Sequence, residues 1–153
     1  MDFMNTYEKE TQSGFLAEIN EGEWTGWNHW MPGDPFEDHV GPFYTKWDVQ
    51  GVVCGFLPSA KNCNGYANIH GGALMTFADF ALFMIPGEGS AMVHGVTVTM
   101  NCEFISGARP DIPLYARGET VKAGRSLLFV RGTIISEDKV VLTFSGTIKR
   151  TQS

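Results

Sequence analysis

The sequence predicts an α+β protein in which an antiparallel sheet of about five to six strands wraps around one long buried helix. Two observations support this prediction. Between residues 73 and 85 the only polar side chains are Thr76 and Asp79, so a helix there would be apolar around its whole circumference and would need to be enclosed. Strand-like segments with short turns lie before and after it, which favours a sheet curled around the helix.

The N-terminal part of the chain has a different character. Residues 1–20 suit a short helix with Phe15 and Ile19 on its apolar side, ending near Gly22. Residues 24–36 are rich in turn formers and aromatics and show no sustained period. Their three tryptophans are expected to cover a core edge or, alternatively, to form the wall or lid of an apolar pocket. We therefore divide the chain into an N-terminal helix and aromatic-rich extension at 1–40 and a main unit at 41–153, within one domain overall.

The main unit contains six expected strands. Two lie between Gly41 and Leu57 and end at Pro58. A polar loop then leads to a helix of about 14 to 16 residues, which opens at a glycine pair and closes at Pro86-Gly87. The other four strands are expected at 93–106, 114–123, 127–136 and 140–150.

The segment 93–106 alternates between apolar and polar side chains. Strict alternation predicts two faces. The apolar face would carry Val96, Val98, Met100, Cys102 and Phe104, and the polar face would carry Thr97, Thr99, Asn101 and Glu103.

Asp79 and the Gly71-Gly72 pair are the unusual residues of the central helix. A buried carboxylate is costly unless it is paired, hydrogen-bonded or used in chemistry. Asp79 is therefore either catalytic or satisfied by a neighbouring strand or water. Free N–H groups at a helix N-terminus stabilise developing negative charge, and glycine allows close approach of a substrate. The pair is thus an oxyanion site or, more simply, a close packing contact.

The spacing of these two features predicts a dimer. Gly71 and Asp79 are eight residues apart, which places them roughly 12 Å apart along a helix. One carbonyl group cannot contact both. If two copies pack with these helices antiparallel across a twofold axis, Gly71 of one copy faces Asp79 of the other.

Composition narrows the range of partners. With 153 residues and a net charge of −6, the chain has single-domain length and is unsuited to nucleic acid or to an anionic membrane surface. Three cysteines without Cys-x-x-Cys spacing favour reduced thiols in the cytoplasm. Four histidines without metal-site spacing predict no metal. The acidic N-terminus with no long apolar run argues against a signal peptide.

The segment 64–72, with Ala78-Asp79, resembles the core motif of hotdog-fold acyl-CoA thioesterases, especially the phenylacetate-pathway type of the 4-hydroxybenzoyl-CoA thioesterase superfamily. The likeness extends to residues 95–101 and 122–126 and spans about 43 to 150. It implies hydrolysis of an acyl-CoA, with CoA as part of the substrate and no separate cofactor. It also implies a homodimer, which in some relatives pairs again as a tetramer.

The resemblance assigns catalytic roles to four residues. Gly71 N–H would stabilise the oxyanion, and Asn64 would help to polarise the carbonyl. Asp79 of the partner subunit would activate water or attack the carbonyl directly. Thr97 would help to hold the water.

Substrate-binding roles follow for a second group. His70 either fixes the loop before the helix or acts on substrate, and Gly72 belongs to the same turn. Arg125, Ser126 and Arg109 are expected either to bind the CoA phosphates or to be solvated turn residues.

Some alternatives remain open at the level of sequence. Phe80 stands where many relatives have Thr after the helix aspartate, so the acyl group is undetermined. A hydratase or dehydratase acting on enoyl or 3-hydroxyacyl thioesters would need a paired His near the carboxylate. A non-catalytic acyl-CoA binding protein would need only the cavity.

Overall fold

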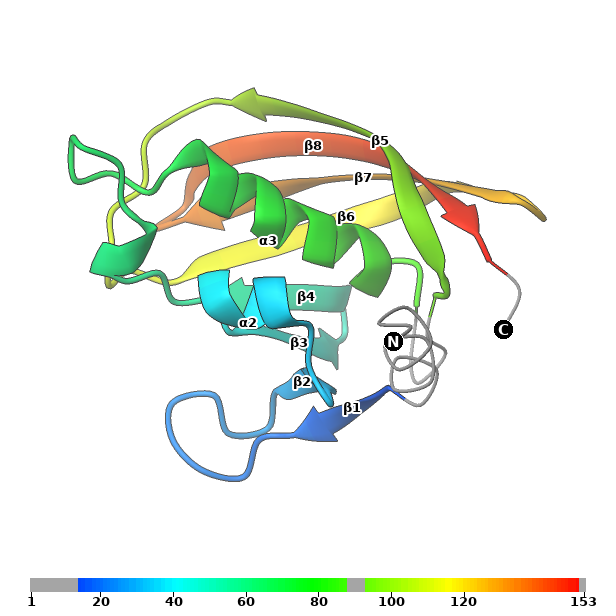
Figure 1. The fold of residues 1–153 in the computed structure, drawn as a ribbon, viewed down its shortest axis with the longest axis horizontal. Helices are drawn as coiled ribbons and strands as arrows, with labels where there is room; N and C mark the ends of the chain where they lie inside the picture. The colour runs from blue at the N-terminus through cyan, green and yellow to red at the C-terminus, as the bar shows by residue number, and fades with distance from the viewer. Residues whose placement is uncertain (1–13, 88–92, 152–153) are drawn as a thin grey trace, which may run out of the picture.

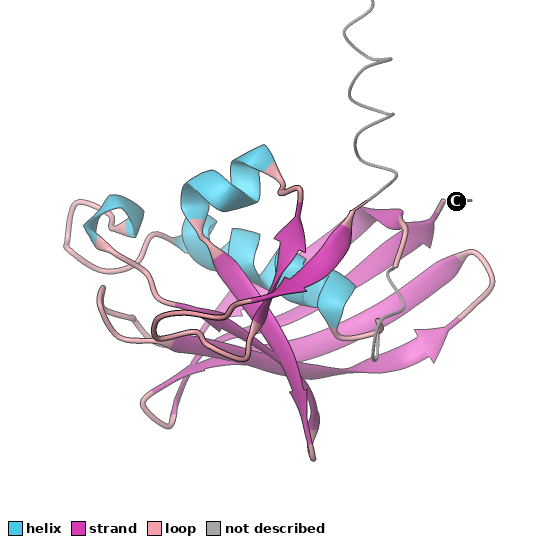
Figure 2. Ribbon diagram, turned by 90° about the horizontal axis from the view of Figure 1, so that it is seen from below, coloured by secondary structure: helices cyan, strands magenta, loops and turns pink. Residues whose placement is uncertain are grey.

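An eight-stranded antiparallel sheet curves around the central helix α3 (Gly71–Met84) in a computed structural model that describes residues 14–87 and 93–151. The sheet order is β1-β2-β3-β4-β6-β7-β8-β5 (Figure 1). Figure 2 shows the helices on one side of the sheet, which bends around them. The strands are β1 (Phe15–Glu18), β2 (Asn28–Met31), β3 (Phe43–Asp48), β4 (Gly51–Phe56), β5 (Gly95–Phe104), β6 (Leu114–Ala123), β7 (Leu127–Ser136) and β8 (Lys139–Arg150).

The hydrophobic core lies between α3 and the sheet. Phe77, Ala81 and Leu82 are fully buried, and the sheet meets them with apolar side chains of β6, β7 and β8. A side chain at Gly146 of β8 would lie 2.5 Å from Leu82 Cδ1. Glycine at this position therefore lets the helix sit directly against the strand.

The predicted helix and six strands of the main unit are confirmed, but the helix is not buried on all sides. Gly72, Met75, Thr76, Asp79 and Phe83 are exposed or half-exposed. These positions follow the 3–4 residue spacing of one helix face. The described residues of one chain therefore leave an open stripe on α3, and Asp79 lies in it.

The sequence prediction of five to six strands and an N-terminal helix is wrong for the described part of the extension. Residues 15–18 form β1, which pairs with β2, and β2 meets β3 at Asn28. The rest of the expected helix lies at residues 1–13, outside the described residues. Pairing with β2 gives the backbone N–H and C=O groups of this segment hydrogen-bond partners. A short isolated helix is only marginally stable in water, so the strand is favoured here.

The run 24–36, predicted to be irregular, contains β2 and leads into the helix α2 (Pro35–Val40). Asp34 caps α2, because its Oδ1 accepts from the N–H groups of Phe36 and Glu37 at 3.1 Å. Proline at the first helical position suits this start. Helix α2 packs against α3, next to the open stripe.

A β-bulge in β5 overturns the predicted alternation of this strand. The pairing with β8 shifts between Thr97 and Thr99, so Val98 is an extra residue. Val96 and Val98 are 52% and 48% exposed instead of lying on the core face. The bulge lets Thr97 face α3 while Met100, further along the strand, packs against the core.

Two further properties concern the cysteines and the length of the helices. The three cysteines are unpaired. Within residues 14–87 and 93–151, no helix has the length and apolar character required to cross a membrane.

Candidate active site

Asp79 and Thr97 are joined by a short hydrogen bond. Thr97 Oγ1 donates to Asp79 Oδ1 at 2.6 Å, bringing α3 and β5 together. Burial raises the pKa of the Asp79 carboxyl, Thr97 acts to lower it, and the nearby charge of Asp34 raises it further. The neighbouring-strand partner, which was the alternative to a catalytic role for Asp79, is therefore present. It leaves the second carboxylate oxygen without a partner in the described residues and so still available to a ligand.

The cleft around Asp79 is formed by α2, α3, β2 and β5. Two adjoining cavities of about 420 and 380 Å³ open onto this carboxylate. Aromatic side chains, among them Trp30 and Phe80, form part of the wall of the larger one. Asp34 and Glu37 line both, and no group of acidic, Cys or His side chains in the described residues is arranged to hold a metal ion.

Glu37 is the functional candidate that the sequence analysis missed. Burial is the main cause that raises the pKa of Glu37 to about 8, and the acidic neighbours Asp34, Asp79 and Asp38 add to the effect. The sequence feature that could have revealed Glu37 is the run Asp34-Pro35 followed by Glu37. Asp at the N-cap, Pro at the first position and Glu at the third are helix-start residues, and they define the helix that carries Glu37 to the cleft.

The N-terminus of α3 presents one free N–H group. Gly72 N–H donates to His70 Nδ1 at 2.8 Å, and Ala73 N–H donates to His70 O at 3.0 Å. No acceptor is found for Gly71 N–H in the described part of the chain. Gly71 is therefore the available donor at this helix end, whereas Gly72 contributes only its lack of a side chain.

His70 fixes the turn before the helix, one of the two roles considered for it. Its Nδ1 accepts the capping hydrogen bond, so the second ring nitrogen carries the proton when the ring is neutral. The backbone N–H of His70 donates to Asn62 O at 2.8 Å. Asn62 is buried and its amide donates to Val40 O at 2.7 Å, which ties this loop to the end of α2.

Asn64 lies in the same loop. Its Oδ1 accepts from Tyr66 N–H at 2.9 Å and from Asn68 N–H at 3.3 Å, so the carbonyl oxygen holds the turn. No acceptor for its amide nitrogen is found among the described residues. This residue can therefore support the loop and still donate to a ligand.

The three residues considered for phosphate binding lie at opposite ends of the sheet. Arg109 follows Ala108, whose carbonyl accepts from Ile69 N–H at 2.9 Å, so it is near the start of α3. Arg125 and Ser126 form the turn between β6 and β7, next to the start of β5. The ten residues of β5 separate the two ends by about 30 Å. All three side chains are exposed.

The tryptophans of the extension divide between two faces of the sheet. Trp24 stacks on Tyr44 with 4.6 Å between ring centroids, and Trp27 contacts Trp24 edge-on at 4.9 Å. Tyr44 points away from the core, so this pair covers the outer face of β3. Trp30 alone lines the cleft of Asp79. The wall or lid interpretation therefore fits Trp30, whereas Trp24 and Trp27 cover the outer face of the sheet instead of a core edge.

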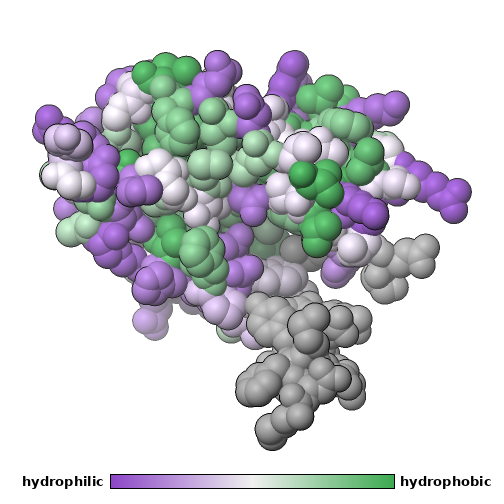
Figure 3. Space-filling model, turned by 45° about the horizontal axis from the view of Figure 1, so that its top comes forward, coloured by the Kyte–Doolittle hydropathy of each residue, from purple (hydrophilic) through white to green (hydrophobic). Residues whose placement is uncertain are grey.

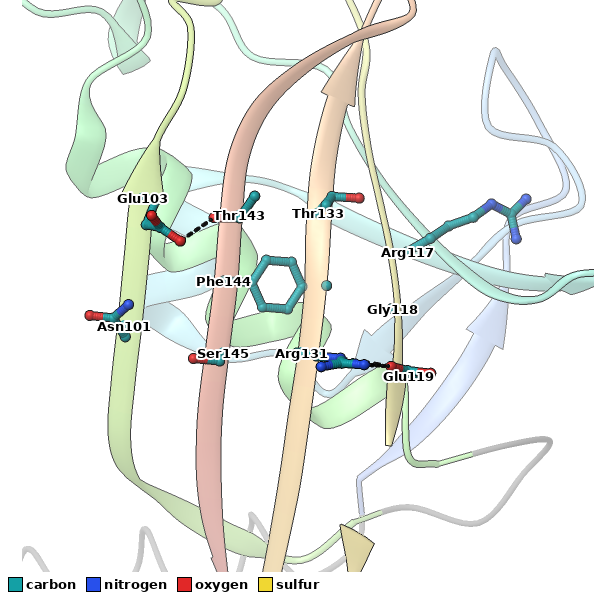
Figure 4. Close-up of a pocket in the computed structure, with 11 residues that line it drawn as sticks. Asn101, Glu103, Arg117, Gly118, Glu119, Arg131, Thr133, Thr143, Phe144 and Ser145 are labelled. Atoms are coloured by element: carbon teal, nitrogen blue, oxygen red, sulfur yellow. Dashed lines mark hydrogen bonds and ion pairs between the residues drawn. The ribbon is translucent and has the colours of Figure 1, made fainter. Parts of the chain in front are cut away.

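A separate hollow of about 600 Å³ lies on the outer face of β5 to β8 (Figure 4). None of the sequence-predicted site residues lines it. Arg131 Nε donates to Glu119 at 2.6 Å, and Arg117 pairs with Asp48. Both arginines that line the hollow are therefore neutralised.

A sheet wrapped around one helix, with a carboxylate of that helix opening into a cleft, defines a hotdog protein with its candidate site on α3. The chain belongs to the thioesterase superfamily, because the family model of that description matches residues 66–143. It is thus a thioester hydrolase. The match includes the end of the loop before α3, from Tyr66 onward, the helix itself and Thr97.

Solved structures share this fold at low sequence identity. A mutant of the phenylacetic acid degradation protein PaaI from Thermus thermophilus is 23% identical, with a TM-score of 0.67, covering 77% of this chain and 100% of that chain. The PaaI protein of Escherichia coli is 19% identical, with a TM-score of 0.68, covering 79% and 87%. A hypothetical thioesterase with coenzyme A from Streptococcus pneumoniae is 24% identical, with a TM-score of 0.63, covering 72% and 87%. Comparison with curated proteins gave no match.

Proposed function

We propose that the protein hydrolyses acyl-CoA thioesters in composite sites, each shared by two subunits of a homodimer. The observation that carries this proposal is the hydrogen-bonded Asp79 in a cleft, separated along the same helix from the free Gly71 N–H. Likeness to a thioesterase with coenzyme A and to a Streptococcus mutans protein bound to acetyl CoA supports the choice of acyl-CoA.

In this mechanism the thioester oxygen receives its hydrogen bonds from one subunit. Gly71 N–H stabilises the negative charge that develops on the oxygen, a contact worth roughly 3 to 4 kcal/mol where such donors have been removed. The Asn64 amide is the second donor. The Cα of Gly71 already lies close to the Phe104 ring, where an added Cβ would be 3.0 Å from it, so glycine keeps this end of the helix open.

The partner subunit supplies the group that acts on the carbonyl carbon. Asp79 takes a proton from water or attacks to form an anhydride that water then opens. Both routes require the ionised carboxylate. Thr97 favours that form by donating a hydrogen bond, and its hydroxyl also lies where it can orient the water.

The open side of the molecule supports pairing of two copies. Strand β5 is an edge of the sheet, and Val96, Val98, Phe104 and Ile105 are each about half exposed along or just beyond it. Figure 3 shows apolar surface across the middle of this face. A second copy placed across a twofold axis would cover these side chains and the stripe of α3. A second twofold axis would join two such dimers into a tetramer.

The same symmetry unites the phosphate-binding candidates. Arg109 lies at the Gly71 end of one chain, and Arg125 and Ser126 lie at the Asp79 end. Antiparallel pairing brings the Asp79 end of one subunit to the Gly71 end of the other. We therefore assign the CoA phosphates to Arg109 of one subunit and the Arg125 turn of the other. The unpaired thiols fit a cytoplasmic location.

The test is thiol release from a panel of short, medium, long and aryl acyl-CoAs by the wild-type protein and by Asp79→Asn. We expect hydrolysis of at least one acyl-CoA, and a fall in kcat of at least about a hundredfold in the variant, the low end for loss of a general base. The melting temperature should be unchanged or raised, because a buried charge is removed.

Three outcomes would contradict this proposal. Near wild-type hydrolysis by Asp79→Asn would show that Asp79 is not the catalytic carboxylate. Loss of enoyl absorbance from crotonyl-CoA without thiol release would favour the hydratase alternative, and acyl-CoA binding without any turnover would favour a binding protein.

A further inference from the structure

Glu37 opens into the same cleft as Asp79. Both carboxyl groups line the cavities of about 420 and 380 Å³. They come from different elements, Glu37 from α2 and Asp79 from α3, and the two helices pack together. A molecule that occupies this cleft in contact with Asp79 is therefore within reach of Glu37.

Among the residues that the structure describes, the charged groups around Glu37 are all acidic. Asp34 and Asp38 face it from its own helix and cap, and Asp79 faces it from α3. His29 of β2 acts on Asp38 instead, and the buried thiol of Cys54 lies behind it on β4. Neither cavity is lined by a described Lys, Arg or His. No cation within residues 14–87 and 93–151 therefore holds this carboxyl in its ionised form.

The two carboxyl groups differ in their hydrogen bonds. The Asp79 carboxylate accepts a hydrogen bond from the Thr97 hydroxyl, whereas no hydrogen bond to the Glu37 side chain is found in the described residues. The environment favours a protonated Glu37, with a pKa of about 8, beside a more acidic Asp79. Neighbouring titratable groups whose environments separate their pKa values are the arrangement used for paired acid and base chemistry.

We propose that Glu37 is the general acid of the thioester hydrolase, donating a proton to the sulfur of the departing CoA. This inference rests on the function proposed above. Ionised Asp79 takes a proton from water as the water oxygen bonds to the carbonyl carbon. The carbon–sulfur bond then breaks, and its electron pair stays on sulfur, which receives the Glu37 proton. The proton on Asp79 passes to Glu37 through the shared cleft, which restores both groups.

The test compares two thioesters of the same acyl group, taken from the best substrate of the acyl-CoA panel. One is the ester of N-acetylcysteamine, an alkyl thiol like that of CoA. The other is the ester of thiophenol, whose thiolate is much less basic and leaves without a proton. In Glu37→Gln we expect kcat for the alkyl ester to fall about a hundredfold, the low end for general acid catalysis, while the thiophenyl ester is hydrolysed at a rate within about threefold of wild type.

Matched variants identify what a failure would mean. Glu137→Gln makes the same change at an exposed carboxyl in the turn between β7 and β8, outside both cavities, and should leave the ratio of the two esters unchanged. Asp79→Asn should slow both esters. Equal loss on both esters in Glu37→Gln, or no loss on either, would overturn the role of Glu37 while leaving the hydrolase function intact. Absence of thiol release by the wild-type protein would instead overturn the proposed function itself.

The wild-type protein gives an independent measurement if Glu37→Gln does not fold. Hydrolysis of the alkyl ester should decline as pH rises through about 8, where Glu37 loses its proton, and hydrolysis of the thiophenyl ester should not. Identical profiles for the two esters up to pH 9.5 would contradict the proposal.

Discussion

A single hydrogen bond favours the ionised form of Asp79, the form that the proposed mechanism uses. Thr97 Oγ1 lies 2.6 Å from Asp79 Oδ1 and opposes the effect of burial, which raises the pKa of Asp79. Since the proposed mechanism requires the ionised form, we expect activity to decline as pH falls through the pKa of this carboxyl. The hydroxyl of Thr97 extends the active range toward acid.

We predict that Thr97→Val moves the acidic limb of kcat/KM to higher pH. Loss of the donor leaves burial unopposed, so the pKa of Asp79 rises. Below the wild-type midpoint the rate should fall about tenfold or more, because hydrogen bonds to charged groups contribute about 1.5–3 kcal/mol. Thr97→Ser keeps the hydroxyl and should keep the wild-type profile. An unchanged profile in Thr97→Val would show that this bond does not control Asp79.

At the scale of residues, part of the candidate site could be predicted from the sequence and part could not. Asp79 and Gly71 were predictable, since a carboxylate in an apolar helix and glycines at its start are local features. The contact of Thr97 with Asp79 depends on a bulge at Val98, which strict alternation does not reveal. To predict Glu37 as a site residue, one would have had to recognise a six-residue helix in a stretch whose composition indicated turns.

At the scale of elements, the N-terminal extension has two separable effects. Strands β1 and β2 lengthen the sheet beyond β3. Trp27 is buried on the outer face of that sheet, where Lys46 Nζ lies 4.5 Å from its ring centroid. Trp30 lies on the inner side and lines the cleft. The first position should affect stability and the second should affect substrate choice.

We predict that Trp27→Ala destabilises the fold by about 3 kcal/mol, the low end for loss of a buried aromatic side chain. This corresponds to a fall of roughly 6–12 °C in Tm for a chain of this length. The preference among acyl groups should not change. Trp30→Ala should instead alter kcat/KM for bulky relative to short acyl groups. Thermal melts and the acyl-CoA panel measure both, and a shifted acyl preference in Trp27→Ala would contradict this division.

The strands of the main unit were predictable because each has its own alternation and a short turn, and β6 and β7 begin and end at the predicted residues. Residues 15–18 were not. Their four positions are too few to show a period of two, and only their pairing with β2, from Phe15 opposite Met31 to Glu18 opposite Asn28, identifies them as a strand.

At the scale of the whole molecule, the proposed shared site predicts complementation between two inactive variants. Asp79→Asn removes the base, and Gly71→Pro removes the oxyanion donor. Proline is accepted at the first position of a helix, and His70 before it has the extended conformation (φ −62°, ψ 137°) that proline requires. The helix should therefore persist without its free N–H.

We expect a mixture of these two variants, after subunit exchange, to recover about one quarter of wild-type activity. Random pairing makes half of the dimers mixed, and each mixed dimer has one intact site of two. Gly71→Ala is the control, because it adds the same first carbon near Phe104 but keeps the N–H. No recovery despite exchange shown by mass, or an active monomer by light scattering, would contradict a shared site.

The exposed edge of β5 also bears on how the protein behaves at low concentration. An unpaired edge strand flanked by apolar side chains is a template on which other chains add and aggregate, and a bulge only partly disrupts that template. If two copies cover this edge, dilution or a weakened interface would release it along with the catalytic groups. Inactivation would then be accompanied by precipitation, and the yield of soluble protein would itself report on assembly.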